Sequence, residues 1–291
     1  MYHSFKEWFA AAERRGLSLA QVVLENEMAL EETDVETVLA TLADRWQVMR
    51  AAAEKALDAP QPMTGGLISG QAQKQTHYAE TGGFTGAALN KAMAWALSAS
   101  EVNASMGRIC AAPTAGACGV LPAALMAAAE LLWAGARQIQ DALLVASGVG
   151  ALISRNATVA GAEGGCQAEC GAAAAMAAAA VVTLAGGSNA MVGQAVSIAL
   201  MNCMGLVCDP VAGLVQLPCS FRNASQTVSA LLSADLALAG QDAVIPPDEV
   251  LEAMARTGHS LPAALRETGM GGVAATPTGK RLKKELKLDE L

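Results

Sequence analysis

Alanine dominates the apolar residues of this chain, while aromatic side chains are nearly absent. Hydrophobic residues make up 53% of the 291 positions, but phenylalanine, tryptophan and tyrosine together contribute only 3%. Alanine is the strongest helix former and covers little area, so a core built from it requires helices that approach one another closely. Alternating β-branched stretches, which are typical of strands, are scarce. The sequence therefore predicts an all-α fold, a compact bundle of Ala/Gly-rich helices.

Charge and hydropathy exclude several classes of protein. The formal net charge of −8 argues against nucleic acid as a partner. The most apolar run, residues 172–185, is shorter than the ~20 residues that cross a bilayer, so a buried helix is expected there and no membrane association. Residues 1–16 contain no apolar stretch with a cleavage site, so export is not expected. With seven cysteines in a cytoplasmic protein, a disulfide framework is not expected either.

Composition divides the chain into three segments. Residues 1–60 are predicted to form a polar helical arm that packs on a partner or on the main body, residues 61–279 an all-helical catalytic domain, and residues 280–291 a charged tail. Loops rich in glycine and polar residues, held on a rigid helical frame, are where chemistry usually takes place. Helices are expected at residues 5–15, 18–28, 34–57, 86–100, 120–136, 139–154, 171–184, 189–206, 224–239 and 247–256. The loops that hold most of the unusual residues are 64–70, 77–85, 103–119, 156–171, 208–223 and 268–279.

Three cysteines lie in two of these loops. Cys166 belongs to NATVAGAEGGCQAECG (residues 156–171), and Cys208 and Cys219 belong to CDPVAGLVQLPCSFRN (residues 208–223). Glycine and proline neighbours let the backbone approach a bulky inorganic group and leave N–H groups free to bond its sulfides. From spacing alone, a metal-cluster site and three small buried core cysteines both remain open.

Zinc is disfavoured by the spacing of the possible ligands. A zinc site typically has a close cysteine pair together with a second pair or with histidines. The closest pair here, Cys166 and Cys170, has no matching second pair, and the chain has three histidines. Cys170 nevertheless remains an alternative ligand, because it lies four residues after Cys166. The other cysteines, Cys110, Cys118 and Cys203, are interpreted as structural thiols.

The two cysteine motifs and ASMGRICAAPTAGACGVLPA (residues 104–123) resemble the alpha chain of bacterial iron–sulfur L-serine dehydratase, over residues 63–275. The resemblance implies a lyase that converts L-serine to pyruvate and ammonia in amino-acid catabolism and gluconeogenesis. It also implies a [4Fe-4S] cluster, with ligands that fall on Cys166, Cys208 and Cys219. A separate α/β domain is either fused or supplied as a beta chain in this family, so a beta-chain partner and a hetero-oligomer are expected.

The C-terminal region departs from the pattern of the fused family members. Those members resemble this chain up to a GG-hydrophobic-A segment, here Gly271-Gly272-Val273-Ala274, and then finish with a cysteine that can cap the open iron. No cysteine follows in this sequence. Three thiolates on a four-iron cluster leave one iron open to a substrate oxygen, which polarises the C–O bond as a Lewis acid does. The sequence leaves open what occupies that iron before substrate arrives.

Candidates for substrate binding lie in the glycine-rich loops. Ser105, Arg108 and Thr114 are candidates for holding the carboxylate, because a helix that starts near Thr114 has free N–H groups that suit an anion. An ordinary helix cap at Thr114 and an ion pair of Arg108 with a loop carboxylate are the alternatives. Asn156 is close to Cys166 in sequence and is a candidate for orienting substrate, as are Glu163 and Gln167.

Lys74 and His77 are the candidate bases within the chain. A lone lysine or histidine is more often an ordinary surface residue, and a base from the partner chain is the other alternative. A pyridoxal-phosphate route needs a Schiff-base lysine and a phosphate cradle. The few lysines of the main body have no such cradle near them. A second class of function, a helical subunit whose cluster senses oxygen or stiffens the fold, remains open.

Overall fold

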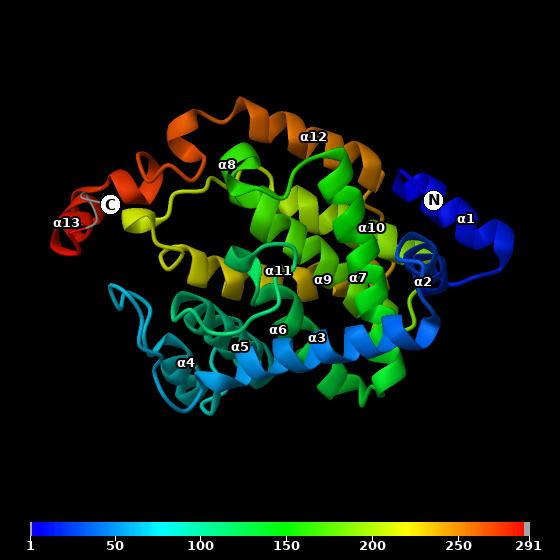
Figure 1. The fold of residues 1–291 in the computed structure, drawn as a ribbon, viewed down its shortest axis with the longest axis horizontal. Coiled ribbons are helices and arrows are strands. Elements are labelled where there is room, and N and C mark those ends of the chain that lie inside the picture. Colours follow the sequence, from blue (N-terminus) through cyan, green and yellow to red (C-terminus); the bar gives the residue numbers. More distant parts are fainter. Residues whose placement is uncertain (1, 288–291) are drawn as a thin grey trace.

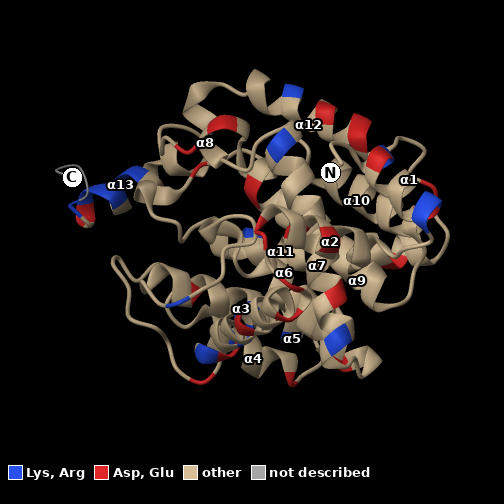
Figure 2. Cartoon of the chain, turned by 45° about the vertical axis from the view of Figure 1, so that its right-hand side comes forward, with Lys and Arg blue, Asp and Glu red and all other residues tan. Residues whose placement is uncertain are grey.

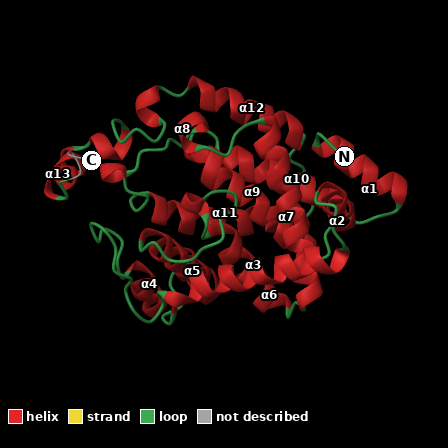
Figure 3. Cartoon of the chain, in the orientation of Figure 1, coloured by secondary structure: helices red, strands yellow, loops and turns green. Residues whose placement is uncertain are grey.

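The computed structural model describes residues 2–287, which form thirteen α-helices and contain no β-strand (Figure 3). The expectation of an all-α fold is confirmed. The α-helices are α1 (Phe5–Arg15), α2 (Leu19–Leu30), α3 (Val35–Lys55), α4 (Gln71–Ala79), α5 (Gly86–Ala104), α6 (Val120–Leu132), α7 (Ala136–Asn156), α8 (Gly161–Gly164), α9 (Ala172–Leu184), α10 (Asn189–Cys203), α11 (Cys219–Leu238), α12 (Pro247–Ser260) and α13 (Pro277–Glu285).

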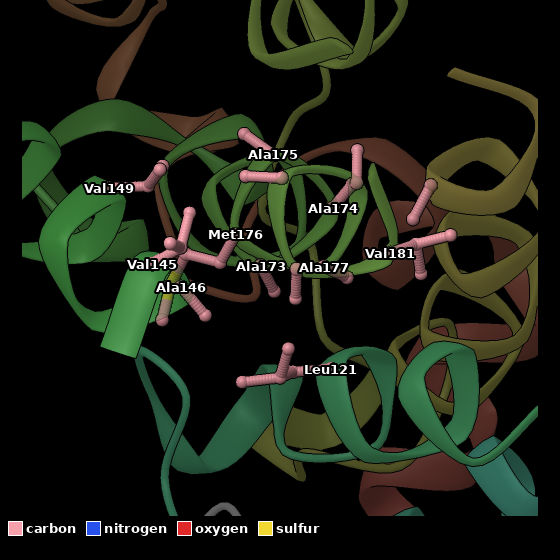
Figure 4. Close-up of a cluster of buried hydrophobic side chains, with 14 of the residues drawn as sticks. Leu121, Val145, Ala146, Val149, Ala173, Ala174, Ala175, Met176, Ala177 and Val181 are labelled. Atoms are coloured by element: carbon pink, nitrogen blue, oxygen red, sulfur yellow. The ribbon is translucent and has the colours of Figure 1, made fainter. Parts of the chain in front are cut away.

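The alanine-rich helix α9 lies at the centre of the bundle, and α6, α7, α10 and α11 pack around it (Figure 1). Every residue of α9 except Thr183 is buried. Figure 4 shows how small its side chains are: Leu121 of α6 points toward Ala173 and Ala177 across a short gap. Close packing all round one helix without bulky side chains is what the alanine-rich composition predicts. Charged side chains lie instead on outer helices such as α12 and α13 (Figure 2).

Two helical stretches are long and apolar enough, by length and composition, to span a membrane. They are Ala115–Leu132 and Gln167–Leu184, and 61% and 89% of their residues are buried within the molecule. Other helices of the same bundle already cover the apolar surface of the second stretch on nearly all sides. This burial is typical of the core helices of a folded domain.

The N-terminal arm packs against the main body. Trp8 of α1 is fully buried in the main hydrophobic cluster, and its indole N–H donates to the carbonyl of Leu19 at 3.3 Å. The Asp248 carboxylate on α12 accepts the N–H groups of Phe5 and Lys6 at 2.8 and 3.0 Å, so it satisfies the free N-terminal donors of α1. The arm is thus joined to the bundle by a shared core and by a cap from a distant helix.

Several helix boundaries differ from those expected from the sequence, and the largest differences are at α4, α11 and α13. Helix α4 was not predicted, and its N-terminus is satisfied from a distance by the buried Glu101 carboxylate of α5, which accepts the Gly70 and Ala72 N–H groups at 3.0 and 2.8 Å. Helix α11 was expected from residue 224 but begins at Cys219. Helix α13 includes the first part of the expected tail, and residues 288–291 of that tail lie outside the described residues.

Gly119 marks the closest approach of the loop before α6 to α5. A Cβ atom there would lie 2.5 Å from the Ala96 carbonyl oxygen, and backbone cannot move aside cheaply. We expect Gly119→Ala to lower the free energy of unfolding by about 1–3 kcal/mol, as overpacking does. Gly150→Ala on α7 is the matched control, because its Cβ would meet only the flexible Met176 side chain while alanine favours the helix. Urea denaturation measures the free energy of unfolding of both variants, and equal decreases in the two would contradict the prediction.

Candidate functional site

Cys166 lies at the start of a sharp turn between α8 and α9. The next five residues, Gln167–Gly171, form a single turn of π-helix, a feature that is frequent at functional sites. Gly165 before it has φ of +75°, and a Cβ there would lie 2.7 Å from the Leu206 carbonyl oxygen, so glycine is required on both counts. The Gln167 N–H donates to that same carbonyl at 3.2 Å. These contacts fix Cys166 next to the segment that leads to Cys208.

Cys208 is held by an isolated parallel bridge to Arg266. Its N–H donates to the Leu265 carbonyl at 2.8 Å, and its own carbonyl accepts the Glu267 N–H at 2.7 Å. A Cβ on Gly161 would lie 3.0 Å from the Cys208 sulfur, so the glycine of α8 allows the backbone to come close to this thiol. The sequence therefore provides a small residue where α8 faces a sulfur atom.

Cys219 is the first residue of α11, and Asn223 fixes it from one turn further along. The Asn223 amide donates to the Cys219 carbonyl at 2.9 Å and to the Gly116 carbonyl at 2.7 Å, and its oxygen accepts the Gly119 N–H at 2.8 Å. One buried side chain thus joins the third cysteine to the loop that contains Thr114.

The loop at residues 64–70 is attached to the same region through Gln216. Its amide donates to the Thr64 carbonyl at 2.6 Å, and its oxygen accepts the Leu67 N–H at 2.9 Å. Gln216 precedes Cys219 by three residues and is almost fully buried. Of the loops predicted to hold the unusual residues, 64–70 and 103–119 are therefore attached to the start of α11.

Arg222 connects the three cysteine segments. On α11, one turn from Cys219, its guanidinium donates to the Val207 carbonyl at 2.6 Å and to the Asp209 carboxylate at 2.7 Å, and its charge lowers the pKa of Cys166. Asp209 in turn accepts the Val273 N–H at 2.6 Å. The Arg222–Asp209 pair is therefore a buried brace between the cysteine loops and the C-terminal segment.

The three thiols lie near enough to influence one another electrostatically. A hydrogen bond from Cys170 and the charge of Arg222 lower the pKa of Cys166, although burial opposes the shift. Burial raises the pKa of Cys219 to about 12, and it raises the pKa of Cys208 further; charge on Cys166 adds to both shifts. Cys166 is thus the thiol with the lowest pKa of the three, and a nearby cation would favour the thiolate forms of the other two.

Glu169 is a functional candidate that the sequence analysis did not identify. It lies on the π-turn three residues after Cys166, and its carboxylate accepts the Thr114 hydroxyl at 2.9 Å and the Cys208 thiol at 3.7 Å. Burial raises its pKa, and the hydrogen bond from Thr114 offsets part of that shift. An acidic residue within one turn of a cysteine proposed as a ligand is the sequence signal that could have identified it.

The structure brings one of the predicted substrate-binding residues into this site. Thr114 is at the start of a short 3₁₀ turn, Ala115–Ala117, but its hydroxyl caps no helix and instead reaches Glu169. Ser105 bonds locally to the Val102 carbonyl at 2.9 Å, at the end of α5. Arg108 is exposed in the same loop, and no hydrogen bond or ion pair engages it among residues 2–287.

The other predicted residues lie elsewhere. The Asn156 amide, at the end of α7, donates to the His3 carbonyl at 2.9 Å and so joins α7 to the N-terminal arm. Lys74 and His77 are exposed on α4, and within the described part of the chain no hydrogen bond or ion pair joins them to the cysteines. Of the two further candidates near Cys166, Gln167 bonds the Met254 carbonyl and the Gly205 N–H, and Glu163 accepts the Thr158 hydroxyl.

The donor set fits a metal centre. Oxygen and sulfur atoms of Glu169, Cys208 and Glu267 lie within 4.8 Å of one another. The sulfurs of Cys166, Cys208 and Cys219 are buried, free of disulfides and grouped less tightly than that. A single zinc ion needs its ligands close together, whereas ligands of a multi-iron cluster bind different metal atoms and stand further apart. The arrangement suits a cluster better than a mononuclear site.

Known proteins resemble the chain over almost its entire length. The profile of the family described as serine dehydratase alpha chain matches residues 14–274. The chain is 46% identical to the L-serine dehydratase alpha chain of Peptoniphilus asaccharolyticus, with 98% of each chain covered, and 42% identical to a probable L-serine dehydratase alpha chain of Bacillus subtilis, with 98% and 95% covered. L-serine dehydratase 2 of Escherichia coli is 37% identical, and this chain covers 61% of it. On these matches and its all-helical fold, the chain belongs to the serine dehydratase alpha chain family.

Proposed function

We propose that this chain is the catalytic alpha subunit of an iron–sulfur L-serine dehydratase, with a [4Fe-4S] cluster held by Cys166, Cys208 and Cys219. The observation that carries the proposal is that these three buried thiols lie close enough to influence one another electrostatically, although 41 and 10 residues separate them in sequence. The names of the relatives support serine as the substrate. Seven free cysteines suit the reducing cytoplasm.

The reaction removes an α-proton and a β-hydroxide from L-serine. The aminoacrylate that forms tautomerises to an imine, and water hydrolyses the imine to pyruvate and ammonia. Hydroxide is a poor leaving group, and a cluster with one open iron supplies a Lewis acid for it. The protein must then position the amino acid, hold its carboxylate and remove the α-proton.

Residues of the loop before α6 are the best placed to bind substrate. The Thr114 hydroxyl, held by Glu169 beside Cys208, is positioned to contact a substrate bound at the cysteines. Arg108, whose guanidinium has no partner in the described chain, is proposed to pair with the substrate carboxylate, with Ser105 nearby in the same loop.

The remaining predicted residues rank lower as parts of the site. Lys74 and His77 stay as candidate bases that would act only if α4 borders the substrate in the complete enzyme. The amide of Asn156 is already bonded to the His3 carbonyl, so it would have to exchange that bond for substrate.

We further propose that a beta chain completes the enzyme as a hetero-oligomer. Two of the matched relatives are named alpha chains and have about the same length as this chain, whereas the Escherichia coli relative is longer. A base for the α-proton can come from this partner.

Anaerobic purification tests the proposal. We expect a brown protein with iron and sulfide in equal amounts, and an absorption spectrum that changes when L-serine is added and bleaches in air. A cluster whose spectrum is unchanged by serine, also with the beta chain present, would favour a structural or oxygen-sensing cluster instead. A colourless protein that forms pyruvate from serine would contradict the proposal, and D-serine serves as the control ligand.

A further inference from the structure

Glu267 is a carboxylate beside Cys208 to which the site described above assigns no role. Its backbone N–H donates to the Cys208 carbonyl at 2.7 Å, and Leu265, two residues earlier, accepts the Cys208 N–H at 2.8 Å. This double attachment fixes the position of Glu267 relative to the cysteine. Its carboxylate oxygen, the Cys208 sulfur and a Glu169 oxygen lie within 4.8 Å of one another.

Glu169 and Glu267 differ in how firmly their carboxylates are held. Glu169 is on the π-turn, half-buried, and accepts the Thr114 hydroxyl and the Cys208 thiol. Glu267 is in a loop, is exposed, and its carboxylate accepts no hydrogen bond and forms no ion pair within residues 2–287. Two carboxylates and a sulfur that face one another repel when all are ionised, and a cation among them removes that repulsion. Glu267 is therefore the free member of a donor group that favours a cation.

We propose that the Glu267 carboxylate is the protein ligand of the fourth iron in the resting enzyme, and that the substrate hydroxyl displaces it. The proposal rests on the cluster assigned above to Cys166, Cys208 and Cys219. Residues 220–291 contain no cysteine, whereas Glu267 lies in this segment beside Cys208. A carboxylate oxygen is a harder ligand than a thiolate and binds such an iron less tightly, which suits a ligand that must leave.

The exposed loop position of Glu267 is consistent with this exchange. Only one bond to iron breaks and another forms, both through oxygen, so no electron is transferred. The released carboxylate returns to solvent, while the two backbone hydrogen bonds keep the main chain of Glu267 beside Cys208. Glu169 stays bonded to Thr114 throughout and continues to line the site.

The test measures how fast the cluster loses its fourth iron, and it does not depend on enzymatic turnover. The experiment uses three proteins, wild type, Glu267→Gln and Glu267→Cys, each reconstituted anaerobically without substrate. Each is then oxidised mildly with ferricyanide. Loss of the fourth iron is followed by the EPR signal of the three-iron cluster that remains. Loss of an outer partner of a metal site already costs about 10- to 100-fold in affinity. We therefore expect Glu267→Gln to lose its fourth iron at least about tenfold faster than wild type. Glu267→Cys should lose it more slowly and should show a weaker spectral response to serine.

Glu13→Gln is the matched control, because Glu13 is an exposed glutamate on α1, at the end of the molecule opposite α13 (Figure 1). It should behave as wild type. Equal rates of iron loss in wild type and Glu267→Gln, both with a full cluster at the start, would overturn the role of Glu267 and leave the proposed function standing. If wild type itself assembles no cluster, both proposals are wrong. Iron and sulfide analysis before oxidation separates the two outcomes, and circular dichroism verifies that the variants are folded.

Discussion

Replacing Cys166, Cys208 or Cys219 singly with serine is expected to abolish retention of the cluster. Thiolates are the ligands that iron–sulfur clusters use, and a serine hydroxyl stays protonated and binds iron weakly. Each variant should contain iron and sulfide near background after anaerobic reconstitution and gel filtration, and should lose serine-dependent pyruvate formation. Iron and sulfide analysis per chain is the measurement.

Two other cysteines supply the controls. Cys203 is fully buried and donates from its sulfur to Gln226 at 2.8 Å, a bond that a serine hydroxyl can also form, so Cys203→Ser should keep its cluster. Cys170 is buried four residues after Cys166 and is not one of the proposed ligands, so Cys170→Ser should keep its cluster as well. The proposed ligand set is wrong if Cys170→Ser loses the cluster and one of the serine variants at Cys166, Cys208 or Cys219 keeps it.

Arg222→Met is expected to lower the free energy of unfolding of the cluster-free protein by about 3 kcal/mol, because breaking a buried ion pair leaves an uncompensated charge. Asp209 is 3% exposed and Arg222 is 16% exposed in their side chains. The substitution removes the bond of Arg222 to the Val207 carbonyl as well, and among residues 2–287 it leaves the Asp209 carboxylate with only its bond from the Val273 N–H. Urea denaturation followed by circular dichroism measures the change.

The matched control is Arg281→Met on α13. Arg281 pairs with Glu285 at 2.8 Å, but both side chains are more than half exposed, and such a pair contributes less than about 1 kcal/mol. If both substitutions lower stability by the same small amount, Arg222 does not brace the cysteine segments. A large loss only for Arg222→Met supports the brace.

The sequence alone determined the fold class and supplied the proposal that Cys166, Cys208 and Cys219 are the ligands. An alanine-rich core with few aromatic residues leaves closely packed helices as the way to bury apolar area, and the main helices, such as α1 and α9, lie where their patterns predict. Helix propensity and hydrophobic spacing act over a few residues, so they can be read from the chain directly. The motifs around Cys166, Cys208 and Cys219 identified the family that the comparisons then showed.

Only the tertiary structure decided which other side chains meet those thiols. Thr114 and Glu169 are 55 residues apart, and Val273 and Asp209 are 64 apart. Helix α4 was missed for the same reason, since the carboxylate that satisfies its N-terminus comes from Glu101, 29 residues after Ala72. Hydrogen bonds of this kind have no local spacing rule, because they form only after packing has brought distant helices together. The three cysteines could thus be proposed from the sequence, whereas the charges and carboxylates near them became visible only in the folded chain.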